Sequence, residues 1–93
     1  MEHLTPKQRK DLKAKSHHLN PVVIIGDKGL TKAVLTESSK ALDAHELIKV
    51  KINIDDRIDR KKITEEMCNE LSATKINEIG KVCVIYREKP TDA

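Results

Sequence analysis

Residues 20–31 read Asn-Pro-Val-Val-Ile-Ile-Gly-Asp-Lys-Gly-Leu-Thr, and they contain the clearest structural signals of the chain. The Asn20-Pro21 pair ends any preceding helix, because the residue before a proline is pushed out of the α region. The run 22–25 that follows is short, apolar and β-branched, as in a strand that is buried on both faces. Glycines then allow a turn, and Thr31 is a suitable N-cap. The stretch therefore predicts a buried strand, a glycine turn and a helix in direct succession.

The chain before this stretch predicts a basic helix. Residues 5–8, Thr-Pro-Lys-Gln, have the pattern of a capping box with proline at the first helical position, and the helix should end near His17. Its apolar stripe is thin, whereas Lys10, Lys13 and His17 recur on one side at helical spacing. We therefore expect a helix that adds little to the core and presents positive charge.

The chain after this stretch predicts two helices and three strands. Residues 47–54 alternate between apolar and polar side chains, as in a strand with one buried face and one basic face carrying Lys49 and Lys51. Asp59 should cap a helix, and two strands around Gly80 should form a hairpin. The expected elements are helices over 6–17, 32–44 and 60–71 and strands over 22–25, 47–54, 75–79 and 81–87.

This order of elements predicts an α+β fold, a two-layer αβαβαββ sandwich with a four-stranded mixed sheet and helices packed against it. For 93 residues we expect a single domain over 1–93, with its core over about 4–87 and a frayed tail after it. Because Tyr86 is the one aromatic residue, the core must be aliphatic and base-stacking platforms are not expected.

The positive charge is unevenly distributed along the chain. The net charge is +3, yet residues 1–32 hold seven Lys or Arg against three Asp or Glu, so the first third carries the whole excess. Clustered positive charge suits a polyanion, because neutralised phosphates release condensed counterions. A merely solvated surface would have the same composition.

The glycine turn is the sharpest candidate site. Its glycines allow close backbone approach, and the helix that follows presents unpaired N–H groups and a partial positive charge, which suits a phosphate. The turn lacks the signatures of a nucleotide P-loop and of a dinucleotide site, and an ordinary tight turn is the alternative. If the first helix packs beside the turn, its cations would converge on the same anion. The candidate RNA-binding residues are Gly26, Asp27, Lys28, Gly29, Thr31, Lys32, Lys7, Arg9, Lys10, Lys13, His17 and His18.

A second basic cluster has a different interpretation. Arg57, Arg60, Lys61 and Lys62 are interleaved with aspartates, which favours ion pairs within the chain over contact with RNA. Lys49 and Lys51 are ambiguous, because outward lysines can contact phosphate or merely keep a sheet soluble.

Several classes of chemistry find no support in the sequence. No activated-serine elbow or cysteine motif is present, so no enzyme and no small-molecule substrate are expected. His17 and His18 point about 100° apart on a helix, and no ligand set completes them, so no metal or cofactor is expected. Cys68 and Cys83 read as two reduced, half-buried thiols rather than a disulfide. No secretion signal or membrane-length apolar run occurs, so we expect a cytoplasmic protein without a membrane partner.

Three stretches together carry a family resemblance: LTPKQRKDLKAKSHHLNPVVIIGDKGLTKAVL, ALDAHELIKVKI and IGKVCVIYR. The sequence resembles the CRM domain, the chloroplast RNA splicing and ribosome maturation domain, in its stand-alone prokaryotic YhbY-like form. The resemblance covers about residues 4–87. It implies a fold similar to the C-terminal domain of translation initiation factor three with an added N-terminal helix. It also implies RNA binding, with the bacterial members associated with precursors of the large ribosomal subunit.

The resemblance places the family's signature loop on residues 26–29 and its basic neighbours on the first helix and Lys32. Members commonly have a basic residue after the first glycine, where this chain has Asp27. That acid leaves backbone amides, Lys28 and Lys32 to hold the phosphate. We therefore expect a ribosome-assembly factor that binds large-subunit ribosomal RNA precursors.

The alternative is a protein-interaction module that docks on a ribosomal protein or assembly factor without contacting RNA. It would use the sheet face with Lys49 and Lys51 and the thin apolar stripe of the first helix. The oligomeric state is left open, with a monomer slightly favoured.

Overall fold

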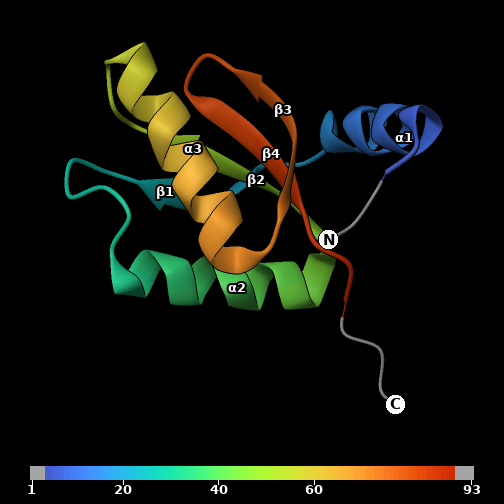
Figure 1. The fold of residues 1–93 in the computed structure, drawn as a ribbon, viewed down its shortest axis with the longest axis horizontal. Coiled ribbons are helices and arrows are strands. Elements are labelled where there is room, and N and C mark those ends of the chain that lie inside the picture. The colour runs from blue at the N-terminus through green and yellow to red at the C-terminus, as the bar shows by residue number, and fades with distance from the viewer. Residues whose placement is uncertain (1–3, 90–93) are drawn as a thin grey trace.

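The computed structural model describes residues 4–89, and the seven expected elements occur in the expected order (Figure 1). Residues 88 and 89 have no regular structure, and the rest of the tail predicted to fray lies outside the described residues. The elements are α1 (Pro6–Ser16), β1 (Pro21–Ile25), α2 (Lys32–His45), β2 (Leu47–Ile52), α3 (Arg57–Leu71), β3 (Thr74–Ile79) and β4 (Val82–Tyr86).

The strands form one four-stranded sheet in the order β1-β2-β4-β3. β1 runs parallel to β2, whereas β4 runs antiparallel to both β2 and β3. This is the expected mixed sheet closed by a hairpin, so the predicted α+β fold is confirmed. Because β4 lies between β2 and β3, the connection through α3 passes over one strand position.

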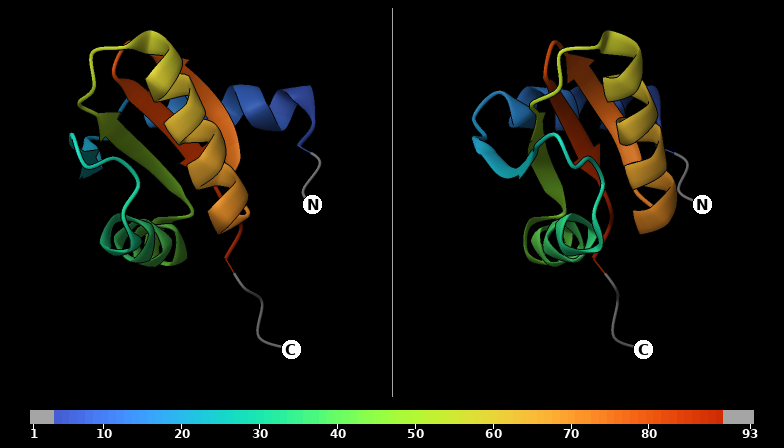
Figure 2. Two further views of the ribbon diagram at one scale, coloured as in Figure 1. Left: turned by 60° about the vertical axis from the view of Figure 1, so that its left-hand side comes forward. Right: turned by 90° about the vertical axis from the view of Figure 1, so that its left-hand side faces the viewer.

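The main core lies between one face of the sheet and the pair of helices α2 and α3, which Figure 2 shows on the same side of the sheet. Ile48, Val50 and Ile52 of β2 are buried in one cluster with Leu42 of α2 and Met67 of α3. Each such side chain contributes about 1.5–3 kcal/mol relative to an exposed one. This face therefore supplies most of the stability, as the alternating pattern of residues 47–54 predicts.

The opposite face of the sheet is covered at one end by α1, which contacts β2 and β3. Leu47 of β2 and Val84 of β4 are buried outside the main core cluster. Neighbouring residues on a strand point to opposite faces, so these two side chains lie on the α1 face. Helix α1 thus closes a small second apolar contact while Lys51, farther along β2, stays exposed.

Strand β1 is one of the two edge strands of the sheet and is buried on one face only. Val23 and Ile25 are fully buried, whereas Val22 is 49% exposed and Ile24 is 63% exposed. The prediction of a strand buried on both faces is therefore wrong. Helix α1 packs against β2 and β3 rather than against β1, so the outer face of β1 remains in solvent.

Local signals place the starts of the first two helices as expected. The capping box of α1 is formed, with the Gln8 amide donating to Thr5 Oγ1 (3.1 Å) and the Thr5 amide donating to Gln8 Oε1 (2.8 Å). The Val34 amide donates to Thr31 Oγ1 (3.2 Å), so Thr31 is the N-cap of α2.

The third helix begins earlier than expected, because its N-cap is Asp56 and not Asp59. The Asp56 carboxylate accepts hydrogen bonds from the amides of Ile58 (2.8 Å) and Asp59 (3.1 Å). Asp59 therefore lies inside the first turn, where a negative charge is still favourable next to the helix dipole. The earlier start brings Arg57 and Arg60 into the first helical turn.

Arg87, directly after β4, ties the sheet to both core helices. Its Nη1 donates to the Leu71 carbonyl at the end of α3 (3.0 Å). Its Nη2 donates to the Ser39 carbonyl (2.9 Å) and the Asp43 carboxylate (2.9 Å) on α2. Charge-assisted hydrogen bonds of this kind fix the position of α2 relative to α3.

Candidate functional site

The glycine turn predicted to bind an anion is open to solvent. Gly26, Asp27 and Lys28 are exposed, and the Gly29 amide donates to the Gly26 carbonyl (2.9 Å) to close the turn. Gly29 has a φ of +69°, a conformation that favours glycine, whereas Gly26 has no positive φ. Only the second glycine is therefore required by backbone conformation.

The amino-terminal end of α2 presents free backbone donors beside this turn. Thr31 accepts the hydrogen bond of the Val34 amide, and the Thr31 amide itself donates to the Gly29 carbonyl (3.1 Å). This leaves the amides of Lys32 and Ala33 without a partner among residues 4–89, as expected at a helix start. The Lys32 side chain is exposed. Two N–H groups, the positive end of the helix dipole and exposed lysines can thus meet an anion here.

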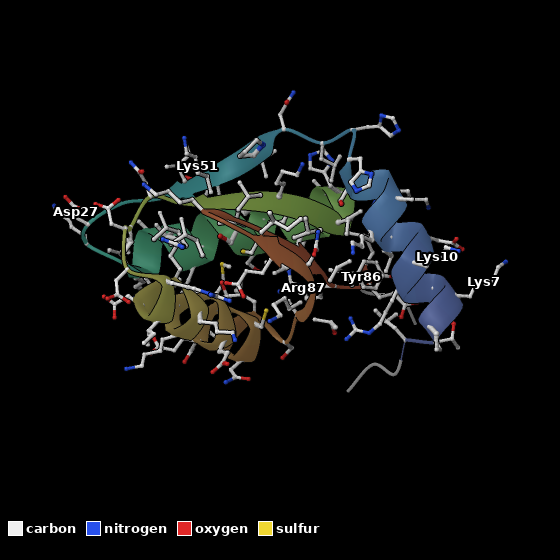
Figure 3. All side chains as sticks on the ribbon, turned by 90° about the horizontal axis from the view of Figure 1, so that it is seen from above. Lys7, Lys10, Asp27, Lys51, Tyr86 and Arg87 are labelled. Carbon is white, nitrogen blue, oxygen red and sulfur yellow. The ribbon has the colours of Figure 1, made fainter. Side chains whose placement is uncertain are left out.

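Helix α1 does not pack beside the turn, so the predicted convergence of its cations on the same anion is wrong. Figure 3 shows Asp27 at one end of the molecule and Lys7 and Lys10 at the other. The longest extent of the molecule is 37 Å. The intervening β1, five residues long, alone carries the chain about 16 Å. Short separation in sequence therefore becomes a long separation in space.

The other candidate residues of the first helix are arranged along this distant element. Arg9 donates from Nη1 to the Lys75 carbonyl of β3 (3.0 Å), so it fastens α1 to the sheet. Lys13 is exposed on α1, and His17 and His18 are exposed just after it, before β1 begins. These residues form a basic surface of their own, separate from the glycine turn.

The helix that does lie beside the turn is α3, which the sequence did not indicate. A hollow of about 370 Å³ is lined by Asp27 and Gly29 of the turn and by Asp59 and Lys62 of α3. Two acids and one lysine share this hollow, so Lys62 offsets part of the negative charge that Asp27 brings. The cations next to the turn in space thus come from the cluster that was assigned to ion pairs.

The predicted ion pairs of that cluster are not found among residues 4–89. Asp56 is occupied as the N-cap, and Asp55 accepts a hydrogen bond from Lys81 Nζ (2.9 Å), which together with the lysine charge lowers the pKa of Asp55. Arg60 donates from Nη1 to the Ile54 carbonyl (2.8 Å) and the Asp55 carbonyl (2.6 Å) instead of to a carboxylate. The aspartates thus serve other roles, and the cluster keeps most of its positive charge.

The outer sheet face combines lysines with exposed apolar side chains. Lys51 is exposed and Lys49 is half-buried, as expected for the outward face of β2. On the neighbouring edge strand Ile24 is the Cα partner of Lys51, and both side chains are open to solvent. This surface was not predicted to be apolar, because β1 was expected to be covered.

The remaining chemical groups add no reactive centre. Both cysteines are free thiols, Cys68 partly buried and Cys83 fully buried rather than half-buried. Burial raises the pKa of Cys68 to about 11 and that of Cys83 to about 12, so both are protonated at neutral pH. Residues 4–89 contain no group of three or more His, Cys, Asp or Glu that could hold a metal ion. In the same range, no helix is both long and apolar enough to cross a membrane.

A comparison with models of known protein families shows to which family this chain belongs. The model of the CRS1/YhbY (CRM) domain matches residues 4–87. The chain belongs to the CRS1/YhbY (CRM) domain family. The resemblance noted in the sequence is therefore confirmed, and the match extends over α1, the glycine turn and all four strands.

Individual relatives agree with this membership. A probable RNA-binding protein of Pseudomonas aeruginosa is 42% identical over 94% of this chain and 84% of its own length. An RNA-binding protein of Haemophilus influenzae is 45% identical over 94% of this chain and 88% of its own length. The solution structure of a hypothetical protein of Staphylococcus aureus superposes with a TM-score of 0.83 at 28% identity, covering 98% of this chain and 95% of that one. The names of the two bacterial relatives describe RNA binding and no catalytic activity, in agreement with the expectation of a protein that is not an enzyme.

Proposed function

We propose that this CRM-domain protein is a non-enzymatic, cytoplasmic RNA-binding protein that acts in assembly of the large ribosomal subunit by binding its precursor RNA. The observation that carries the proposal is the exposed turn of residues 26–29 at the start of α2, with free amides at Lys32 and Ala33. Phosphate oxygens are the natural ligands of such a helix start. Family membership and the names of the relatives support RNA as the source of the phosphate.

The geometry favours a structured RNA over a mononucleotide. The basic surface of α1, formed by Lys7, Lys10, Lys13, His17 and His18, lies at the other end of the molecule from the turn. One RNA that contacts both must extend over a distance comparable to the 37 Å length of the protein. With Tyr86 as the one aromatic residue, backbone and shape recognition is favoured over base stacking.

A protein partner is the second candidate, favoured by the outer sheet face. Val22 and Ile24 are exposed apolar residues on an edge strand, and Lys51 stands beside Ile24. Exposed apolar side chains with cations among them are typical of protein-binding surfaces. In this case a ribosomal protein or assembly factor would dock there, and the glycine turn would be dispensable.

Charge reversal at the turn separates the two candidates. We expect Lys28→Glu with Lys32→Glu to abolish the salt-dependent binding of ribosomal RNA precursor fragments in a filter-binding titration, because the phosphate would meet two negative charges. Loss of co-sedimentation with large-subunit precursors should accompany it. Lys89→Glu is the control, since Lys89 is exposed and its amide donates to the Glu46 carboxylate (2.8 Å) just before β2, at the end of that strand opposite to the turn. Retained co-sedimentation of the turn variant would favour the protein-docking function, and absence of any salt-dependent binding by the unaltered chain would contradict the proposal.

A further inference from the structure

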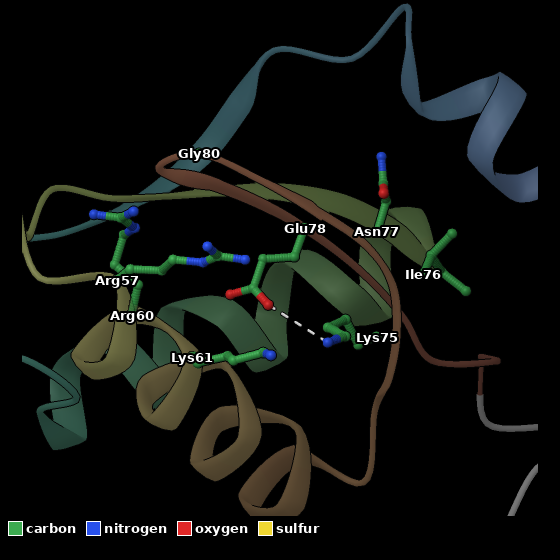
Figure 4. A pocket seen from close by; sticks show the side chains of 8 residues that line it. All are labelled: Arg57, Arg60, Lys61, Lys75, Ile76, Asn77, Glu78 and Gly80. Atoms are coloured by element: carbon green, nitrogen blue, oxygen red, sulfur yellow. Dashed lines mark hydrogen bonds and ion pairs between the residues drawn. The ribbon is translucent and has the colours of Figure 1, made fainter.

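A second hollow, distinct from the one beside the turn, lies between α3 and β3 and has a volume of about 630 Å³. Figure 4 shows the side chains that line it from the two elements. We call its charged lining the α3–β3 cradle: Arg57, Arg60 and Lys61 of α3 with Lys75 and Glu78 of β3. The volume lies within the range of roughly 300–1,000 Å³ that is typical of ligand sites, but such sites are mostly apolar. This one has four cations.

The spacing on α3 explains why three of these cations share one side of the helix. Arg57, Arg60 and Lys61 stand at positions i, i+3 and i+4, which bring side chains onto one helical face. That face is turned toward β3 in Figure 4. Arg60 is held in place by its hydrogen bonds to the Ile54 and Asp55 carbonyls. A guanidinium so fixed is a pre-oriented donor for an oxyanion.

The positive charge of the cradle is only partly compensated. Its one acid, Glu78, pairs with Lys75 (3.4 Å) and also lies 3.1 Å from the Thr64 hydroxyl, so it is already engaged. Arg57 and Lys61 form no ion pair with any other residue from 4 to 89. Like charges held together on one surface repel each other, and a bound anion relieves that repulsion.

The position of the cradle relates it to the glycine turn. Lys62, the next residue after Lys61, lines the hollow that contains Asp27 and Gly29. The first turns of α3 therefore lie between the glycine turn and the cradle. A polyanion that leaves the amino-terminal end of α2 can pass over Lys62 and reach the cradle. Helix α1 contacts β3 from the opposite face of the sheet, where Arg9 donates to the Lys75 carbonyl.

We propose that the α3–β3 cradle is a second phosphate-binding site, which takes a backbone phosphate of the same RNA that is bound at the glycine turn. This proposal rests on the proposed function, because it assigns the site to RNA. Phosphate fits better than a carboxylate of an acidic protein because the cradle offers several charged donors around one hollow, and phosphate presents several oxygens to bind them. The RNA path would then run over α2, α3 and β3.

The test uses Arg57→Glu with Lys61→Glu in the full chain, compared with the Lys89→Glu control. An acid in the first turns of a helix is favourable to the helix dipole, so the variant should fold, which urea unfolding verifies. We expect the log-log salt slope of binding to a ribosomal RNA precursor fragment to fall by roughly two units relative to the control. The charge-conserving variant Arg57→Lys with Lys61→Arg should keep the salt slope of the unaltered chain, since both positive charges are retained.

Amide NMR of the full chain with inorganic phosphate, against chloride at equal ionic strength, localises the contact. We expect shifts in residues 57–61 and 75–78 that disappear in the Arg57→Glu, Lys61→Glu variant and persist in the Lys28→Glu, Lys32→Glu variant. An unchanged salt slope in the cradle variant would refute the cradle while leaving the glycine turn as the RNA site. Failure of the unaltered chain to bind RNA would overturn both proposals. Equal shifts with polyglutamate, together with an unchanged RNA slope, would make the cradle a protein-binding site and refute its assignment to RNA.

Discussion

Helices α1 and α3 both carry clusters of positive side chains, but their surroundings differ. Helix α1 lies over one end of the sheet, with Ser16 its one buried residue. Helix α3 buries Thr64, Met67 and Leu71 on the side that packs against the sheet. It still presents Arg57, Lys61 and Lys62 to solvent. The sequence marks α1 as the basic helix and α3 as a helix of internal ion pairs. In space α3 lies next to the glycine turn, and α1 does not.

This difference shows that the charge of a helix must be judged after its acids have been assigned. A count of charges along the sequence suggests that the aspartates near α3 neutralise its cations. In the structure, however, Asp56 caps the helix and Asp55 pairs with Lys81. The cations of α1 have fewer acidic neighbours but are anchored to a part of the sheet remote from the turn. A functional surface therefore depends on which charges are already engaged as well as on how many there are.

The largest expected difference between the two helices is in stability. Met67→Ala on α3 should lower the free energy of unfolding by about 2–5 kcal/mol, because Met67 is fully buried and its loss leaves a cavity. Leu12→Ala on α1 should cost roughly half as much or less, because Leu12 is half-buried. Urea unfolding of the two variants measures both values. Equal losses would mean that α1 belongs to the same cooperative core as α3.

A smaller difference is expected in RNA binding. Lys10→Ala with Lys13→Ala should lower the salt slope by up to about two units on a duplex that spans the protein, and by none on a short hairpin that reaches only the turn. Lys62→Ala should lower the slope by about one unit on both RNAs, because Lys62 of α3 lines the hollow that contains Asp27 and Gly29. Filter binding between about 50 and 200 mM salt measures the slopes. A loss on the short hairpin in the α1 variant would place α1 at the turn after all.

The smallest expected difference concerns the two aspartates at the start of α3. Asp56→Ala should destabilise the protein by about 1 kcal/mol, because the amides of Ile58 and Asp59 lose their acceptor. Asp59→Ala should cost only a few tenths, since it removes a favourable charge in the first turn but no cap. Thermal unfolding at neutral pH distinguishes them. The reverse order would restore Asp59 as the cap.

Much of the fold could be predicted because its signals are local. The capping box at Thr5, the cap at Thr31 and the alternation predicted over residues 47–54 each depend on neighbours within a few positions. The structure contains both caps and the alternation, although the strand ends at Ile52 and not at residue 54. The turn at residues 26–29 could be located for the same reason. Its RNA-binding role remains a prediction, as do the roles of the basic residues on α1.

What could not be predicted involves contacts between distant parts of the chain. The continuous apolar run of β1 predicts burial on both faces, but Ile24 is exposed because α2 covers only the inner face of this strand. The proximity of Lys62 to the turn depends on the connection that brings α3 back across the sheet. The apolar residues 22–25 do not indicate which helix will pack on them, and the basic residues of α3 do not indicate which loop will lie beside them.

Local sequence patterns were enough to predict the order of elements, the caps of α1 and α2, the inward face of β2 and the family. These properties follow from backbone sterics and side-chain periodicity, which act over a few residues. Which cations share a surface with the glycine turn depends instead on how the chain folds. That depends on strand pairing and helix packing, which place residues far apart in the chain side by side and neighbours in the chain at opposite ends.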